Sequence, residues 1–549
     1  MEFSRTSNGR LIEKDKHGML FTSYEFLFFV LVTCVLYYTI PKKWQWMLLL
    51  LASYVFYYLA GASFLPYLFI TTVSTYLTAR KVTNLQIMAE AYIKEHKTEL
   101  SREERKAYKT KEKKKQWRIL LLCLFLNIGI LAVVKYTNFA ISNVNAVLTT
   151  FGSKMRVEFV DFVLPLGISF YTFQSMGYII DVYRGKYQAE QNPFRFALFV
   201  SFFPQLVQGP ISRYHDLAKT LYEEHKWNKT IVASGLQRML WGYFKKLVVA
   251  DRMLVAVNTL IKAPEEYQGA YVFVGMLFYA LELYADFTGG IDITIGIAEV
   301  LGIRVTENFH RPYFAKNIKE YWNRWHITMG SWFTDYIFYP ISVCQPMLKF
   351  SKFARKHFGE WIGKRMPVYL SSFAVWFTTG IWHGASWNFI VWGLSNFVVI
   401  MISQELEPWY RKFHQKFAKA EKSSLFKVFR VVRTVLLMSS LRMFDCYKDV
   451  PLTFRMFGSM FTTWNWNVLW DGSLLTLGLK GKDFIILLLG TLSMSIVSLL
   501  QRSGSVREKI RVQKLSIRFV LWYGLFLIVL LFGAYGVGYD ASQFIYNQF

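Results

Sequence analysis

Charged residues are scarce in this sequence of 549 residues. They make up 18% of the chain, against about 25% in soluble domains. The stretch from Met366 to Gln404 contains no Asp, Glu, Lys or Arg, although about 20 apolar residues already span a bilayer. Hydrophobic residues reach 53%. The composition excludes collagen, a coiled coil, a disordered chain and a small secreted scaffold, and it indicates a polytopic integral membrane protein.

Motifs that hold metals or nucleotides are also absent. The four cysteines, Cys34, Cys123, Cys344 and Cys446, are far apart in or beside apolar runs, so we expect buried apolar residues rather than metal ligands or a redox pair. No Walker A loop, GxSxG elbow, HExxH helix or DxDxDG loop occurs. We therefore expect no metal site, no bound cofactor and no nucleotide hydrolysis. Acyl transfer from an activated thioester fits, because one base suffices to take a proton from a hydroxyl nucleophile.

Apolar runs of spanning length recur along the whole chain and predict roughly a dozen helices. An isolated span must satisfy its own backbone hydrogen bonds, and the alternating pattern of a membrane β-barrel is missing, so the fold class is predicted to be all-α. The runs lie near residues 21–40, 44–60, 64–79, 119–140, 163–182, 194–211, 236–257, 271–301, 368–402, 431–444, 484–500 and 517–537.

The net charge of +27 has a plain explanation in a membrane protein, because basic residues collect in cytoplasmic loops and face anionic lipid. Residues 80–118 hold about twice as many basic as acidic residues, which places this loop in the cytoplasm. The charges mix at helical spacing, so we expect a solvated helix at the membrane surface. Lys42-Lys43 and Arg184 with Lys186 agree with this topology, which puts the N-terminus outside. Nucleic acid is excluded as a partner, and the polar N-terminus is not a signal peptide.

The middle of the chain, residues 163–403, differs from the flanking segments 1–162 and 404–549, which we interpret as N-terminal and C-terminal transmembrane helices. Between Val163 and Asn388 the apolar background carries Pro, Gly, His, Asp, Arg and Asn. A polar group at membrane depth is costly unless it has a partner. Chemistry is therefore expected in residues 163–403.

His383 is the most informative single residue, because it lies near the centre of the uncharged stretch. An ionisable group at that depth is a functional candidate by default. Burial disfavours the charged imidazole, which keeps the ring neutral and able to accept a proton. Gly380 and Gly384 flank it, so a substrate or another helix can approach closely. The alternative is a structural histidine bonded to a neighbouring helix.

His326 is the second candidate, within the aromatic segment 321–333. On a continuous helix, Trp322, Trp325, Met329 and Trp332 would form one aromatic face, with the polar residues around His326 emerging beside it. Such a segment suits either a membrane-interface anchor or the wall of an active site.

Several blocks in chain order make the sequence resemble a membrane-bound O-acyltransferase (MBOAT), and most of all the bacterial branch that contains the alginate O-acetyltransferase membrane proteins. Each block alone is weak, but the ordered set is specific. The blocks are Leu164–Phe170 with Tyr178–Tyr183, Phe202–Gln205 with Gly209–Ile211, Gly242–Lys246 with Ala250–Asp251, Tyr284–Gly289, Asn308–Phe309 with Pro312–Tyr313, Trp322–His326 and Trp382–Ala385.

The resemblance implies a bowl of tilted helices around a central tunnel, with His383 at its narrow middle as general base and His326 as a second catalytic histidine. It implies transfer of an acyl group, most simply acetyl, from a cytoplasmic thioester such as acetyl-CoA to a hydroxyl outside. The acceptor would be an extracellular or cell-wall polysaccharide or an extracellular transfer partner, and the location a bacterial cytoplasmic membrane. Residues expected to support the substrate are Asn323, Arg324, Asp335, Trp382 and Asn388.

Two other functions remain open from the sequence. One branch of the family serves D-alanyl transfer to teichoic acid, although the two apolar runs after Asp445 look more like the acetylating branch. A transporter or flippase that moves an acyl donor or lipid-linked sugar is the alternative from another class. That alternative predicts internal symmetry between two halves, whereas both signature histidines lie in one stretch.

Overall fold

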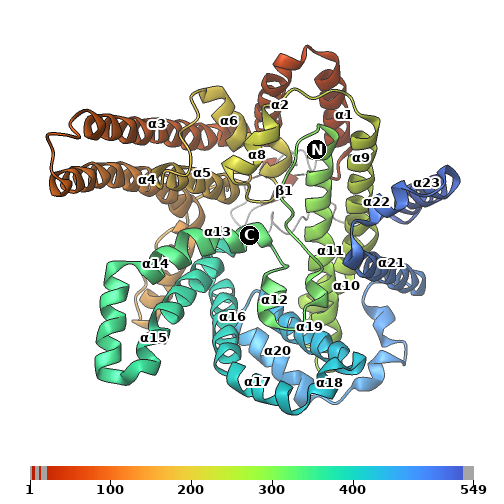
Figure 1. The fold of residues 1–549 in the computed structure, drawn as a ribbon. Coiled ribbons are helices and arrows are strands. Elements are labelled where there is room, and N and C mark those ends of the chain that lie inside the picture. The colour runs from red at the N-terminus through yellow and green to blue at the C-terminus, as the bar shows by residue number, and fades with distance from the viewer. Residues whose placement is uncertain (1–2, 6–10, 14–20, 536–549) are drawn as a thin grey trace.

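The computed structural model describes residues 3–5, 11–13 and 21–535, and its fold is helical (Figure 1). The exception is an antiparallel pair of three-residue strands, β1 (Phe3–Arg5) and β2 (Leu11–Glu13). The prediction of an all-α protein is therefore confirmed apart from this short ribbon. Four helices form the N-terminal part, namely α1 (Tyr24–Thr39), α2 (Gln45–Ala60), α3 (Leu65–Glu95) and α4 (Arg102–Thr150).

The middle of the chain is built from long helices joined by short and broken ones. Its first half contains α5 (Ile168–Tyr183), α6 (Pro193–Ser201), α7 (Phe203–Leu206), α8 (Tyr214–Leu221), α9 (Lys229–Tyr243), a π-helical turn (Phe244–Ala250), α10 (Asp251–Lys262) and α11 (Ala270–Val300). Its second half contains α12 (Ile318–Trp322), α13 (Ile327–Phe333), a second π-helical turn (Thr334–Phe338), α14 (Tyr339–Val343), α15 (Gln345–His383) and α16 (Trp387–Glu405).

The C-terminal part continues this helical pattern and packs against the middle. It comprises α17 (Glu407–Lys416), α18 (Ala418–Lys422), α19 (Ser424–Tyr447), α20 (Val450–Thr462), α21 (Gly481–Leu500), α22 (Val506–Arg511) and α23 (Leu515–Phe532). The helices cross at steep angles, with α11 through the centre (Figure 1).

Fewer individual helices are long enough to span a bilayer than the roughly dozen expected. Within the described residues five helices meet the length and hydropathy required, or six if the pair Lys42–Ala60 and Ala62–Glu95, bent by 114°, forms one span. The difference arises where an apolar run is broken. The run at 194–211 becomes α6 and α7, because Pro204 lacks the N–H that would continue α6.

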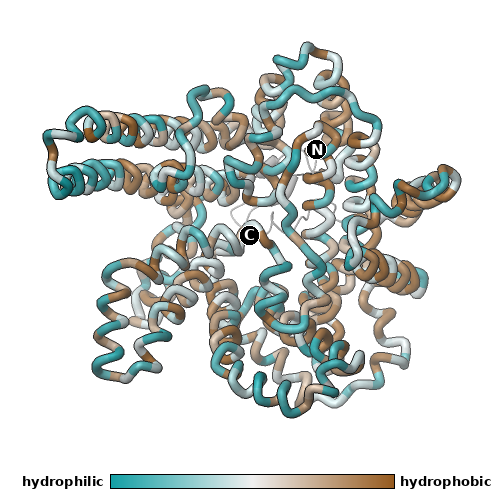
Figure 2. Tube along the Cα trace, viewed as in Figure 1, coloured by the Kyte–Doolittle hydropathy of each residue, from teal (hydrophilic) through white to brown (hydrophobic). Residues whose placement is uncertain are grey.

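The basic segment 80–118 is helical, as expected, but as extensions of two helices rather than as one surface helix. Helix α3 runs to Glu95 and α4 starts at Arg102, where Ser101 and Glu104 form a reciprocal capping box. The two helices lie side by side and project from the body (Figure 1). Figure 2 shows hydrophilic residues at the free end of this hairpin, in keeping with a position outside the lipid.

Several buried charges in the middle of the chain are paired. Lys246 Nζ lies 2.6 Å from Asp286 Oδ1 and 2.8 Å from Asp251 Oδ1, while Lys245 Nζ lies 2.6 Å from Asp292 Oδ2. These ion pairs join the π-helical turn to α11 through Asp286 and Asp292, and to the start of α10 through Asp251. Pairing offsets the cost of removing each charge from water, and removal of one partner would leave the other charge buried alone.

Close packing of α9 against α11 depends on glycine. A Cβ on Gly242 would lie 2.6 Å from the carbonyl oxygen of Gly289, and one on Gly296 would lie 2.8 Å from that of Gly235. Each helix therefore presents two glycines seven residues apart to its antiparallel neighbour. Small residues let membrane helices approach closely enough for van der Waals packing.

Replacing Gly242 by Val should force these helices apart and destabilise the protein by about 1–3 kcal/mol, as overpacking of a tight core does. The measurement is the temperature at which the detergent-solubilised protein no longer runs as a single monodisperse species. Gly129→Val on α4 is the matched control, because a Cβ there meets nothing within 4 Å. Equal melting of both variants would contradict the packing argument.

Candidate active site

His383 lies at a break between two helices. It is the last residue of α15, and α16 begins at Trp387. The chain turns here because Gly384 and Ser386 have extended backbones. A Cβ on Gly384 would lie 2.1 Å from the Phe389 ring, and one on Gly380 2.6 Å from the Phe389 carbonyl oxygen. The glycines therefore admit α16, rather than a substrate, close to the histidine.

A cavity of about 260 Å³ adjoins the His383 imidazole, where the resemblance implies a tunnel. Its walls come from α4 through Lys135, from the segment Leu164–Phe170, and from Val207 and Trp382. Gly167 has a positive φ of 69° and packs against the Leu206 carbonyl, which lets this segment turn into α5. His383 as a residue is 7% exposed, so it is buried although it lines the cavity.

His326 is fully buried and has a left-handed backbone with φ 48° and ψ 54°. The expected continuous helix from Trp322 to Trp332 is wrong, because α12 ends at Trp322 and α13 starts after His326. The break is held by a short bridge between Phe309 and Trp325. A non-glycine residue in this region costs of order 1–3 kcal/mol, and such strain clusters at functional sites.

Asn308 fixes the orientation of the His326 ring. Its Oδ1 lies 3.1 Å from His326 Nδ1 and accepts hydrogen bonds from Thr328 N at 3.1 Å and Thr328 Oγ1 at 2.9 Å. The Phe287 and Phe309 rings contact the imidazole at centroid distances of 5.0 and 6.5 Å. The second histidine therefore has a defined rotamer and position.

Trp382 lies between the two histidines. Its ring centroid is 6.0 Å from that of His326 and 5.0 Å from that of His383. Trp392 contacts His383 from α16 at 4.8 Å. Two segments far apart in the sequence thus bring both candidate imidazoles to one aromatic centre, and the cavity reaches this centre at Trp382 and His383.

Arg442, from the C-terminal part of the chain, completes the centre. Its guanidinium lies over Trp392 at 4.6 Å and Trp325 at 5.3 Å, and it forms a 2.7 Å ion pair with Asp445. The sequence marks it only as a charge at membrane depth, and nothing in its spacing connects it to the histidines. Cation–π contacts of a desolvated arginine are worth about 2 kcal/mol or more.

The predicted supporting residues lie in different places. Asn388 is buried beside the break and donates to the Phe444 carbonyl at 3.1 Å. Asn323 is exposed at the end of α12, and Arg324 pairs with Glu320 at 2.6 Å. Asp335, with 42% of its side chain exposed, pairs with Arg213 at 2.9 Å. Of these residues, Trp382 and Asn388 adjoin the His383 break, whereas the interactions of Arg324 and Asp335 are with other charged groups.

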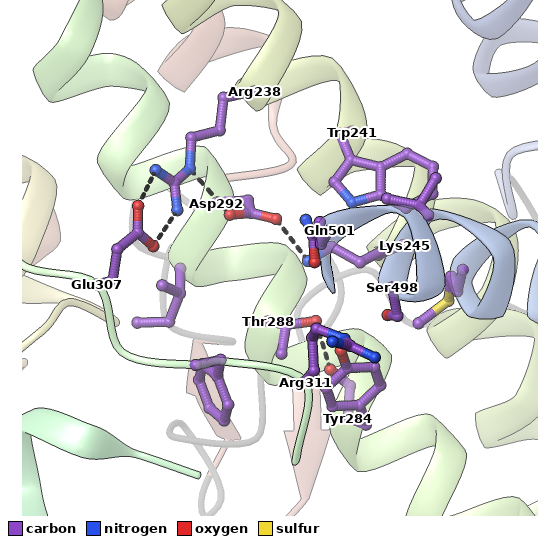
Figure 3. Close-up of a pocket in the computed structure, with 14 residues that line it drawn as sticks. Arg238, Trp241, Lys245, Tyr284, Thr288, Asp292, Glu307, Arg311, Ser498 and Gln501 are labelled. Carbon is purple, nitrogen blue, oxygen red and sulfur yellow. Dashed lines mark hydrogen bonds and ion pairs between the residues drawn. The ribbon is translucent and has the colours of Figure 1, made fainter. Parts of the chain in front are cut away.

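A second, charged pocket of about 90 Å³ is lined in part by the residues next to Asn308. Arg238 donates to both carboxylate oxygens of Glu307 at 2.6 Å and to Asp292 at 2.9 Å, and Lys245 completes the network (Figure 3). The side chains of Glu307, Phe309 and Arg311 line this pocket, while Asn308 between them faces His326. Arg238 therefore anchors the loop that orients the second histidine.

No group of three or more His, Cys, Asp or Glu residues with metal-binding geometry occurs among the residues that the structure describes. Neither histidine belongs to such a group. The chemical groups at the centre are two imidazoles, the indole rings and the Arg442–Asp445 pair, which can move a proton and stabilise charge.

The left-handed backbone at His326 predicts that His326→Asn retains more thermal stability than His326→Val. Asn adopts this conformation readily, whereas a β-branched side chain is a true outlier there. We expect a difference of about 1–2 kcal/mol, measured as the melting temperature of the two detergent-solubilised variants. A valine variant as stable as the asparagine variant would show that the backbone at this position is unconstrained.

Comparisons with a family model and with individual known proteins point to the same family. Residues 191–444 match the membrane-bound O-acyltransferase (MBOAT) family. The chain is 30% identical to the probable alginate O-acetylase AlgI of Azotobacter vinelandii, over 82% of this chain and 79% of that protein. It is 30% identical to the peptidoglycan O-acetyltransferase of Helicobacter pylori, over 68% of this chain and 66% of that protein.

A more distant match is the teichoic acid D-alanyltransferase of Bacillus subtilis, 29% identical over 45% of this chain and 61% of that protein. The family match at residues 191–444 includes both histidines, and the matches to the two O-acetylating relatives cover 82% and 68% of this chain. Together with the helical fold and the buried histidine centre, they show that this chain belongs to the membrane-bound O-acyltransferase family.

Proposed function

We propose that this chain O-acetylates an exported or cell-wall polysaccharide, with His383 as general base. The observation that carries the proposal is the His383 imidazole beside a cavity of about 260 Å³, at a centre shared with His326. Acyl transfer is the chemistry of the family, and the relatives named alginate O-acetylase and peptidoglycan O-acetyltransferase support a polysaccharide acceptor and an acetyl group.

In the proposed reaction, neutral His383 takes the proton of an acceptor hydroxyl as its oxygen attacks the carbonyl carbon of a thioester. The carbon–sulfur bond then breaks, and the imidazolium returns the proton to the leaving thiolate. The products are an ester and a free thiol. A positioned base of this kind contributes about 10²–10⁴-fold to the rate, and the reaction needs neither a metal ion nor a bound cofactor.

His326 is proposed to contact the substrate rather than to act as the first base. Its Nδ1 lies against Asn308, so the opposite nitrogen, Nε2, is the one suited to a reacting group. Trp382 forms the wall that both imidazoles share. Asn388 supports the His383 break through its bond to the Phe444 carbonyl.

The proposal includes the direction of transfer. The thioester, acetyl-CoA or a carrier-protein thioester, enters from the cytoplasm, the side of the basic α3–α4 hairpin. The acceptor, either the polysaccharide itself or an extracellular transfer partner, is on the other side of the membrane. The basic residues of segment 80–118 support this orientation, which puts the N-terminus outside a bacterial cytoplasmic membrane.

Replacement of His383 by Gln should lower acetylation by about 10²–10⁴-fold, the contribution of a general base. The measurement is the O-acetyl content of the cell's polysaccharides by mass analysis, at matched protein level in the membrane. His357→Gln is the control and should retain activity, because His357 lies before the kink that Gly359 (φ 87°) makes in α15, is exposed and bonds to its own helix backbone. Normal acetylation by the His383→Gln variant would exclude this residue from the mechanism.

The same mass analysis identifies the acyl group. Loss of acetate from a polysaccharide in cells that lack this chain supports the proposal. Loss of D-alanine from teichoic acid would replace it with the activity named for the Bacillus subtilis relative.

Asp335→Asn should lower acetylation less than threefold and leave membrane insertion unchanged, because this half-exposed carboxylate pairs with Arg213 and such exposed pairs contribute only about 0–1 kcal/mol. The comparison uses the same polysaccharide analysis, with wild type and His383→Gln in parallel. A loss as large as that of His383→Gln would show that Asp335 contacts the substrate.

A further inference from the structure

The helix that ends at His383 leaves backbone carbonyl groups that need hydrogen-bond donors from other segments. The last four carbonyl groups of a helix have no intrahelical donor, and water is scarce within a membrane protein, so each unsatisfied group costs several kcal/mol. In α15 the amide of Gly384 bonds to the Gly380 carbonyl at 3.3 Å. The carbonyls of Ile381 and Trp382, directly before the histidine, require donors from elsewhere.

Both donors come from α4, which lies outside the family match at residues 191–444. Lys135 Nζ donates to the Trp382 carbonyl at 2.5 Å, and Tyr136 Oη donates to the Ile381 carbonyl at 2.7 Å. A lysine at a helix C-terminus bonds the last carbonyls and is favoured by the helix dipole. Lys135 therefore caps the helix that carries the proposed base.

Helix α4 also holds the chain on the other side of the break. Trp387 Nε1, at the start of α16, donates to Asn143 Oδ1 at 2.8 Å. Residues 135, 136 and 143 are spaced by seven and eight positions, which puts them on one face of a helix. Three side chains of α4 thus bind the chain on both sides of the break. Lys135 and Tyr136 bond to the backbone before His383, and Asn143 bonds to the Trp387 indole after it.

Lys135 is the member of this set that also reaches the reaction space. It lines the same cavity as His383 and Trp382, and it bonds to the carbonyl of the residue directly before His383. Displacement of a reacting group by about 1 Å can cost about 10²-fold in rate. The ammonium group is thus placed to set the position of the imidazole.

We propose that Lys135 is a positioning residue of the active site, which holds His383 against the cavity by capping α15, with Tyr136 and Asn143 completing a clamp from α4. The proposal rests on the proposed function of His383. It extends the active site to the N-terminal helices, which the sequence marks only as membrane spans.

The test compares Lys135→Met, which keeps an unbranched side chain one atom shorter but removes its donors, with Lys135→Arg, which keeps both charge and donors. The readout is O-acetyl content per amount of full-length protein in the membrane, together with the melting temperature in detergent. Thr137→Val is the matched control, because Thr137 bonds only to its own helix at the Val133 carbonyl.

We expect Lys135→Met to lower acetylation by about 10²-fold, Lys135→Arg to restore at least a tenth of the wild-type level, and Thr137→Val to match wild type. If Lys135→Met fails to accumulate, Tyr136→Phe carries the test, since it removes one donor and keeps the ring; it should lower acetylation several-fold at wild-type stability.

Wild-type acetylation by Lys135→Met, or by Tyr136→Phe where the methionine variant is absent from the membrane, would overturn the proposal. Failure of Lys135→Arg to exceed Lys135→Met at equal thermal stability would do the same. The His383→Gln variant separates this result from the proposed function. If that variant is inactive while Lys135→Met is active, only the role of Lys135 is lost. If His383→Gln is active, the proposed role of His383 as general base fails, whatever the result for Lys135.

Discussion

The backbone hydrogen bonds at the break between α15 and α16 are the constraint on which the rest of this site depends. A helix that ends inside a membrane protein leaves carbonyl groups that lipid cannot satisfy. Here the chain ends a helix at His383 and resumes at Trp387. Three helices hold this break in place. Side chains of α4 donate to the carbonyls before His383, and α16 packs against Gly380 and Gly384. Asn388 connects the break to α19 through the Phe444 carbonyl.

The second histidine is held by a comparable device. The loop before it is anchored to α9 by Arg238 and Glu307, and Asn308 on the same loop contacts the ring. Both imidazoles thus sit at interruptions of helical structure, and both are fixed by polar side chains from other segments. Preorganised groups in a water-poor site contribute more to catalysis than the same groups in water. The paired charges around α11 provide the rigid centre against which these segments lie.

Much of this could be predicted from the sequence. The lack of charge gave the membrane class, and His383 stood out because it is ionisable within an uncharged stretch. The place of Arg442 could not be predicted, since its contacts with Trp325 and Trp392 join segments with no common periodicity. The role of Lys135 could not be predicted for a different reason. Its partner is a backbone carbonyl, and no pattern of side chains in the sequence indicates such a bond. The tryptophan spacing around His326 favoured one helix, and the backbone bridge to Phe309 overrode it.

The most direct test of the account is a structure of the full-length chain in a lipid nanodisc with a non-hydrolysable acetyl thioester analogue. We expect the acyl carbonyl to lie in the cavity at His383, where a hydroxyl that donates a hydrogen bond to the imidazole can attack the carbonyl carbon. An analogue bound elsewhere, with the His383 cavity closed to both faces of the membrane, would contradict it.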